Sequence, residues 1–320
     1  LTLWLVPKQT VQTKQPLNLL QALILVIAIL MLIYSIKTSI YAFSFWMVLV
    51  FAVGLCLLVG FVRHQLRAVQ PMIDFSLFKN PVISTSIVMA MVAMIALVGF
   101  ELLLSQELQF VYGYTPLEAG LFILPFMIAI SIGGPFTSVL MNHYGLRPVA
   151  TVGMLMCAVC FFGLAMTDFG THYIQAWIWM VLMGISVEIA LLSSTAAIMS
   201  AVSPEKATAA GAIEGMAYEL GAGLGVAIFG LLLSLFYAQA IVLPEMLPAN
   251  MLTEASSSIG EAISLLRHLD PALMQELKQA ASDAFIHSHS KVLTISGVMF
   301  LILSVFVWRA LPDKVQSADS

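Results

Sequence analysis

Five glutamates lie in or near long apolar stretches of the sequence, where an ionisable side chain is costly and is a candidate for function. No lysine or arginine lies near the middle of any of these stretches, so the sequence offers the carboxylates no fixed positive partner. A carboxyl group removed from water favours its neutral, protonated form. Such a group can carry a proton or bind a cationic ligand, and this is the chemistry that the sequence suggests. The five are Glu101, Glu107, Glu188, Glu214 and Glu219.

Two of these glutamates share one apolar stretch with a tyrosine. Glu214 and Glu219 are separated by about 140° around a helix, so they point to different faces. Glu214 and Tyr218 are four residues apart and share a face. Glu219 is further than Glu214 from the charged edge at Lys206, and we expect it to be the principal substrate or proton-coupling residue. The alternative is a neutral carboxyl group bonded to a facing helix.

The other three glutamates differ in depth. Glu188 lies in the middle of its stretch, and we expect it to take part in function. The alternative is an inert carboxyl group bonded to a neighbouring serine. Glu101 and Glu107 lie near the outer end of their stretch. Either could lie inertly at the membrane surface, Glu107 more so than Glu101, so only Glu101 is kept as a site candidate.

Two short sequences could allow conformational change. A Gly-Gly-Pro sequence that contains Gly134 and Pro135 interrupts one stretch past its middle, and proline there frees a carbonyl and permits a bend. A tight turn follows at 142–148, in which Gly145 supplies a permissive backbone. Arg147 in this turn could hold a neighbouring helix end or an acidic group. We expect these four residues to act in gating.

Glycines four residues apart recur in the stretch that holds Glu214. Gly211 and Gly215 form one G-x-x-x-G pattern, and Gly221 and Gly225 form another. This spacing allows two helices to approach closely. Static packing is the common meaning, and close but sliding contact is the second interpretation.

The composition and the motifs exclude several classes of function. The chain is 61% hydrophobic and 9% charged, with a mean hydropathy of +1.00, whereas soluble domains carry about 25% charged residues. The lipid bilayer must therefore surround most of the chain. A net charge of −4 without a basic tract makes nucleic acid an unexpected partner. The sequence shows no H-E-x-x-H, G-x-S-x-G or phosphate-binding glycine loop, so we expect neither an enzyme nor a cofactor.

Two pairs of residues have types that can bind metal. Cys157 and Cys160 lie inside an apolar stretch without a second pair nearby, so we expect them to be packing residues. His287 and His289 lie just outside the last stretch, where a solvated loop end is the favoured interpretation. We therefore expect no metal site.

Membrane-spanning helices must position these residues. A spanning helix needs about 20 mostly apolar residues, and it satisfies its own backbone hydrogen bonds, which lipid cannot do. Lys and Arg divide nine to four between alternate connections, which predicts that both ends of this chain are cytoplasmic. The sequence predicts an all-α polytopic membrane protein with eight spans, at 17–36, 43–62, 82–104, 117–141, 149–168, 173–201, 208–240 and 291–311.

Two connections and the first residues carry further expectations. Pro71 is placed to begin a short helix along the membrane surface. The connection at 241–290 has apolar residues at helical spacing and an Asp270-Pro271 helix start, which favours two short helices folded as a hairpin over a disordered linker. The apolar residues 1–6 are too short to span, so we expect them to be the end of a helix that begins earlier.

Three segments resemble the fourteen-helix drug:proton antiporters of the major facilitator superfamily. They are the segment at 71–80, the Tyr-Gly-Tyr-Thr-Pro segment that begins at Tyr112, and the turn at 142–148, which lacks the usual aspartate of the family's loop motif. The resemblance implies two inserted helices followed by the C-terminal six-helix bundle of that fold. The implied parts are the end of helix six with a linker (1–16), the inserted helices (17–62), a cytoplasmic linker (63–81), the six-helix bundle with its outer hairpin (82–311) and a cytoplasmic tail (312–320).

Within that group, the sequence Tyr218-Glu219-Leu220-Gly221 and the long outer connection resemble the methyl viologen and quaternary ammonium resistance exporters. The resemblance implies that Glu219, and less directly Glu214, recognise cations and couple protons. It implies efflux of lipophilic organic cations by a monomer in the bacterial inner membrane, driven by the proton gradient without a cofactor. A transporter of a neutral or anionic solute, or a membrane protein that does not transport, is the alternative.

Overall fold

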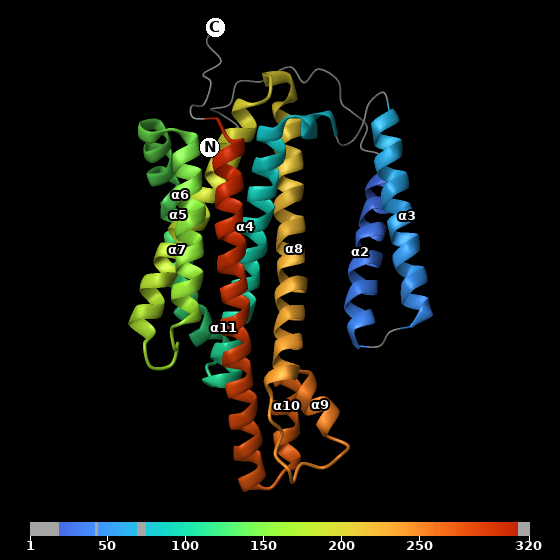
Figure 1. Ribbon diagram of the computed structural model, residues 1–320, viewed down its shortest axis with the longest axis vertical. Coiled ribbons are helices and arrows are strands. Elements are labelled where there is room, and N and C mark those ends of the chain that lie inside the picture. Colours follow the sequence, from blue (N-terminus) through green and yellow to red (C-terminus); the bar gives the residue numbers. More distant parts are fainter. Residues whose placement is uncertain (1–18, 42–43, 69–74, 313–320) are drawn as a thin grey trace. The chain divides into compact units, whose positions relative to one another are not determined.

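The computed structural model describes residues 19–41, 44–68 and 75–312, and these residues form helices and their connections without a β-strand (Figure 1). The chain divides into two units between Phe75 and Ser76. Seven of the described helices are long and apolar enough to cross a membrane. The prediction of an all-helical membrane protein is therefore confirmed.

The first unit contains two packed helices, α2 (Leu19–Tyr41) and α3 (Phe45–Arg67). They occupy the stretches at 17–36 and 43–62, although only α3 meets both the length and the composition of a span within the described residues. Gly54 of α3 faces Ala28, whose carbonyl oxygen would lie 3.2 Å from an added Cβ. At one end of the pair, Gln65 donates a hydrogen bond of 2.9 Å to the side-chain oxygen of Gln21. Small residues and polar side-chain bonds, including one between Gln21 and His64, thus hold this pair.

The second unit is built from six long helices and a small hairpin (Figure 1). Asn80, Thr115 and Asp270 each cap a helix by accepting a backbone N–H bond, and proline follows each of them as the first helical residue. The predicted helix start at Asp270 is thereby confirmed. The long helices are α4 (Pro81–Gln106), α5 (Pro116–Tyr144), α6 (Leu146–Ala165), α7 (Tyr173–Ser200), α8 (Ala207–Ala240) and α11 (Pro271–Ala310).

Helix α8 packs closely on α4 through one of its two glycine pairs. A Cβ on Gly221 would lie 2.6 Å from the Met91 carbonyl oxygen, and a Cβ on Gly225 would lie 2.6 Å from that of Ile95. Only glycine allows such an approach of two backbones. At Gly215, in the other pair, an added Cβ would meet nothing within 4 Å. The packing interpretation therefore holds for Gly221 and Gly225 only.

The core of the second unit is aromatic. The ring of Phe100 in α4 meets those of Phe126 in α5 and Phe161 in α6 edge-on, at centroid distances of 5.6 and 6.3 Å. Phe161 in turn lies 5.5 Å from Phe300 in α11. The contact between Phe161 and Phe300 is tilted, at an interplanar angle of 30°. Aromatic contacts of these two kinds add to the burial of large apolar rings, and together they join four helices of the bundle.

The hairpin differs from the prediction. Two short helices, α9 (Leu252–Ser257) and α10 (Ile259–Leu265), precede a 3₁₀ turn at 266–268, but the second predicted helix is not a separate element. It is the first part of α11, which continues without interruption into the span predicted at 291–311. Neither glycine nor proline occurs between Ala272 and Ser296, so no residue stops the helix.

Two further predictions concern single segments. Helix α5 continues unbroken through Pro135, so the predicted interruption is wrong. In the turn after the proline, the hydroxyl groups of Thr137 and Ser138 donate to the carbonyl oxygens of Gly133 and Gly134. The predicted surface helix lies partly outside the described residues, because only the 3₁₀ helix η1 (Phe75–Lys79) is described.

Candidate functional site

Glu214 lies at the centre of a buried hydrogen-bond cluster between α7 and α8. Its side chain is 4% exposed. One carboxylate oxygen accepts bonds from the Thr195 hydroxyl at 2.6 Å and from the Tyr218 hydroxyl at 2.9 Å. The two hydroxyl oxygens lie 3.1 Å apart, so the three groups form a closed ring. The predicted pairing of Glu214 with Tyr218 on one helix face is confirmed.

A serine layer ties this cluster to α4. Ser194 donates a hydrogen bond of 2.8 Å to the carbonyl oxygen of Ser86, and its hydroxyl lies 3.5 Å from the Glu214 carboxylate. The hydroxyl of Ser86 is itself buried without a partner among the described residues. Polar groups of three helices, α4, α7 and α8, are therefore linked by hydrogen bonds around one buried carboxyl group.

Glu188 lies half-buried on α7, against the two adjacent glycines of α5. A Cβ on Gly133 would lie 3.0 Å from the Cβ of Glu188, and a Cβ on Gly134 would lie 3.2 Å from its carboxylate oxygen. Gly134 therefore provides room for a carboxylate in an unbroken helix. Tyr218 lies within electrostatic reach of both Glu188 and Glu214, so these three predicted residues are brought together.

Glu219 lies outside this cluster, on an exposed stripe of α8. The stripe consists of Ala212, Gly215, Glu219, Gly223 and Val226, at the three-to-four-residue spacing of one helix face, and all five are exposed. A Cβ on Gly215 or Gly223 would meet nothing within 4 Å. Glu219 lies further from Lys206 along α8 than Glu214 does, as the sequence indicates, but within this unit the buried one of the two is Glu214.

The structure corrects the prediction for the outer end of α4. Glu107 is 2% exposed and pairs with Nδ1 of His289, which is 1% exposed and lies inside α11. Neither residue is an inert surface group or part of a solvated loop end. His287 is exposed but lies within α11, so the loop-end interpretation is wrong for it as well. Glu101 is half-buried in α4, away from the Glu214 cluster.

Arg147 and Gly145 shape the junction of α5, α6 and α11. Arg147 donates a hydrogen bond of 2.5 Å from Nε to the carbonyl oxygen of Leu311, and its guanidinium carbon lies 5.8 Å from the ring centroid of Trp308. It therefore holds a helix end, one of its two predicted partners. Gly145 joins the two helices with φ +91°, a conformation that favours glycine.

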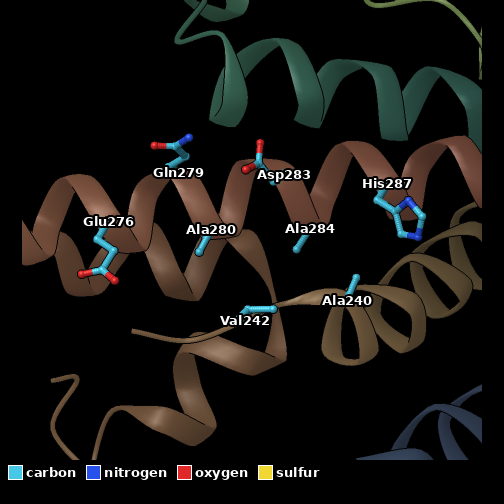
Figure 2. Close-up of a pocket in the computed structure, with 8 residues that line it drawn as sticks. All are labelled: Ala240, Val242, Glu276, Gln279, Ala280, Asp283, Ala284 and His287. Carbon is cyan, nitrogen blue, oxygen red and sulfur yellow. The ribbon is translucent and has the colours of Figure 1, made fainter. Parts of the chain in front are cut away.

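The second unit also has a cavity of about 440 Å³ where α11 leaves the end of α8. Figure 2 shows Ala280 and Ala284 of α11 facing Ala240 and Val242, with Glu276 and Asp283 on the same helix. None of the predicted site residues lines this cavity. The described part of the chain also brings together no group of three His, Cys, Asp or Glu side chains that could hold a metal ion.

Ser194 and Thr195 are site residues that were not predicted from the sequence. The signal was nevertheless present, because Thr195 follows Glu188 by seven residues and so lies on the same face of α7. The Glu107–His289 pair had no such signal, since 182 residues separate its members.

The comparisons with known proteins agree on one protein family. Residues 17–226 match the Major Facilitator Superfamily. The chain is 52% identical over 313 residues to the methyl viologen resistance protein SmvA of Salmonella typhimurium, a match that covers 97% of this chain and 63% of that protein. It is 28% identical to the multidrug efflux pump LfrA of Mycolicibacterium smegmatis, over 95% of this chain and 60% of that one. The chain thus spans less than two thirds of the length of these curated relatives.

A solved structure supports the fold. The crystal structure of a bacterial homolog of the human lysosomal transporter Spinster, in an inward-facing and occupied conformation, matches with a TM-score of 0.56 at 18% identity. The match covers 89% of this chain and 65% of that one. Together with the family match and the 52% identity, it supports the resemblance drawn from the sequence. The chain is an integral membrane protein and belongs to the major facilitator superfamily, among the relatives of the methyl viologen resistance and multidrug efflux transporters.

Proposed function

We propose that the protein exports lipophilic organic cations, such as viologens, quaternary ammonium compounds and dyes, in exchange for protons. The observation that carries this proposal is the placement of two glutamates on α8, Glu214 in a buried hydroxyl cluster and Glu219 on an open face. The similarity to a methyl viologen resistance protein supports the substrate class, because methyl viologen is an organic dication.

In this proposal Glu214 holds the proton. A buried carboxylate is strongly disfavoured without a cation, but the hydroxyl groups of Thr195 and Tyr218 can bond either its charged or its neutral form. The carboxyl group can therefore bind and release a proton while its hydrogen bonds to Thr195 and Tyr218 are kept. Glu188, the second carboxylate within electrostatic reach of Tyr218, contributes to the same electrostatic environment.

Glu219 provides the group that faces the cation. It lies on the open stripe of α8, with small residues on either side that leave room for a bulky ligand. Tyr218 is its neighbour in the chain and bonds Glu214 directly. A shift or rotation of this part of α8 therefore moves both carboxyl groups at once, which would couple cation binding to proton release.

The remaining expectations complete the proposal. The similarity to a bacterial resistance protein supports a place in the bacterial inner membrane. The distribution of Lys and Arg favours both ends of this chain in the cytoplasm. The energy source is the proton gradient and no cofactor is required. The exporter acts as a monomer, and Gly145 and the Arg147 contact with the end of α11 guide the movement of the helices.

The function is tested with Glu219→Gln in the complete protein, assayed in vesicles with an imposed pH gradient. We expect efflux of methyl viologen and of a cationic dye to fall at least about tenfold, because the amide removes the negative charge that the cation needs. Glu254→Gln, an exposed substitution on α9, is the matched control and should leave efflux unchanged. Undiminished efflux in Glu219→Gln, or transport of an anion instead, would rule the proposal out.

A further inference from the structure

A buried pair of ionisable residues, Glu107 and His289, lies at the hairpin end of the bundle. The proposed transport function does not involve it. Glu107 belongs to a π-helical turn, η2 (Glu107–Val111), that ends α4, and His289 lies within α11. The carboxylate meets Nδ1 of the imidazole, and both side chains are almost fully buried. Single π-helical turns are rare and are frequent at functional sites, because the extra residue turns the following side chains to new directions.

The imidazole of His289 has an apolar environment on its remaining sides. The ring of Phe169 stacks on it at a centroid distance of 5.8 Å, and that of Phe285 meets it at 6.2 Å. Its second nitrogen, Nε2, is buried without a hydrogen-bond partner among the described residues. Buried nitrogen atoms rarely lack a partner in folded proteins, and strain, a functional role or a bound water or ion are the usual reasons for an exception.

The number of protons on this pair determines whether it is stable. With one proton in total, the pair is either an ion pair or two neutral bonded groups, and both forms are compatible with burial. Loss of that proton leaves Glu107 as a buried anion beside a neutral imidazole. A second proton leaves His289 as a buried cation without an anionic partner. Both changes are costly in an apolar environment, so the contact is favoured only in the singly protonated state.

Two ionisable groups lie next to the pair. Burial and the charge of Glu107 both raise the pKa of Tyr112, so this phenol remains neutral. Partial burial raises the pKa of Asp168, but hydrogen bonds from Gly170, Thr171 and Tyr112 outweigh it, and the pKa is lowered overall. Asp168 therefore remains charged, and neither group supplies the pair with a titrating partner near neutral pH.

The other ionisable groups on the surrounding elements are directed elsewhere. Glu101 lies nearly two turns earlier on α4. The Tyr237 hydroxyl donates to the carbonyl oxygen of Ala255. The Tyr114 ring meets that of Phe122, and the buried thiols of Cys157 and Cys160 lie on α6. Five further groups are exposed to solvent, namely His172 beside α7, Glu261 on α10, and Asp283, His287 and Lys291 on α11.

We propose that Glu107 and His289 form a second proton-binding site, which holds α4 against α11 while it carries one proton and releases them when it gains or loses one. Because of its position, this pair can affect the packing of the whole hairpin end of the bundle. Helix α11 is continuous from the hairpin through the bundle, and Phe110 in the same π-helical turn lies against Gly260 of α10. Opening of the pair would therefore free the hairpin end of two core helices together.

The test is the thermal unfolding of the purified complete protein between about pH 5 and about pH 9, which brackets the usual titration range of histidine. His289→Gln is expected to lower the unfolding temperature by about 5 °C or more near the middle of this range, and by much less at either end. Loss of packing alone would lower it equally at every pH. His287→Gln, two residues away on the exposed face, is the matched control and should reproduce the wild-type profile.

A second measurement keeps the proposal testable if His289→Gln folds poorly. Infrared difference spectra of the wild-type protein on acidification should show a carboxyl band that is missing in Glu107→Gln. A His289→Gln profile parallel to that of the wild type, or the same infrared band in both proteins, would overturn the proposal. The infrared band that Glu107→Gln removes should persist in Glu214→Gln, so this result is independent of the transport proposal.

Discussion

Replacing Gly225 with valine is expected to separate α8 from α4 and to leave little correctly folded protein in the membrane. The first side-chain carbon would lie 2.6 Å from the carbonyl oxygen of Ile95 and 3.1 Å from its Cα. These are backbone atoms, which cannot rotate away as a side-chain tip can. Overpacking of a close-packed interior costs about 1–3 kcal/mol, and a backbone clash falls at or above the upper end of this range. Yield and unfolding temperature of the purified protein measure the effect.

The matched control is Gly230→Val on the same helix. It has the same change in volume and helix propensity, but a Cβ at Gly230 would meet nothing within 4 Å. We expect near wild-type yield from this variant. Equal yields of the two variants would show that α8 does not pack on α4 through Gly225, and the position assigned to the Glu214 cluster would then also be wrong.

Replacing Glu214 with glutamine is expected to reduce proton-driven efflux at least about tenfold while the protein still folds. The amide oxygen can accept the bonds that Thr195 and Tyr218 now donate to the carboxylate, so the shape of the cluster is retained. The amide cannot bind or release a proton at accessible pH, so coupling is lost. Efflux in vesicles, with and without a pH gradient, measures the change.

Two milder variants separate the proton from its hydrogen bonds. Tyr218→Phe and Thr195→Val each remove one bond to Glu214, a change of about 1 kcal/mol, and leave the carboxyl group in place. We expect these variants to change the pH dependence of efflux and to retain transport. Full proton-driven efflux in Glu214→Gln would exclude Glu214 as the coupling residue.

The sequence predicted those parts of the fold that depend on local patterns. Apolar stretches located the long helices, and Asp270 with Pro271 located the start of α11, because caps and hydrophobic length act within a few residues. The pairing of Glu214 with Tyr218 followed from their four-residue spacing. The sequence predicted a separate short helix before the span at 291–311. The helix continues into that span because no glycine or proline stops it.

Features that depend on packing between distant helices could not be predicted. Glu214 is buried because α4 and α7 place Ser86, Ser194 and Thr195 around it. The sequence of α8 alone does not predict these neighbours. The same holds for His289, whose partner Glu107 lies on another helix. The distance of each glutamate from Lys206 along α8 served as a guide to its burial. Burial depends instead on the helix face that carries the residue. Which face is covered is known only from the tertiary structure.

The most direct test of the central claim is the release of protons when substrate is added to the purified complete protein in weakly buffered solution. We expect methyl viologen to release protons from the wild type. Glu214→Gln should bind methyl viologen but release fewer protons, whereas Glu219→Gln should lose binding and release together. Binding without any proton release by the wild type, or equal release by the wild type and Glu214→Gln, would contradict the claim that α8 exchanges a proton for a cation.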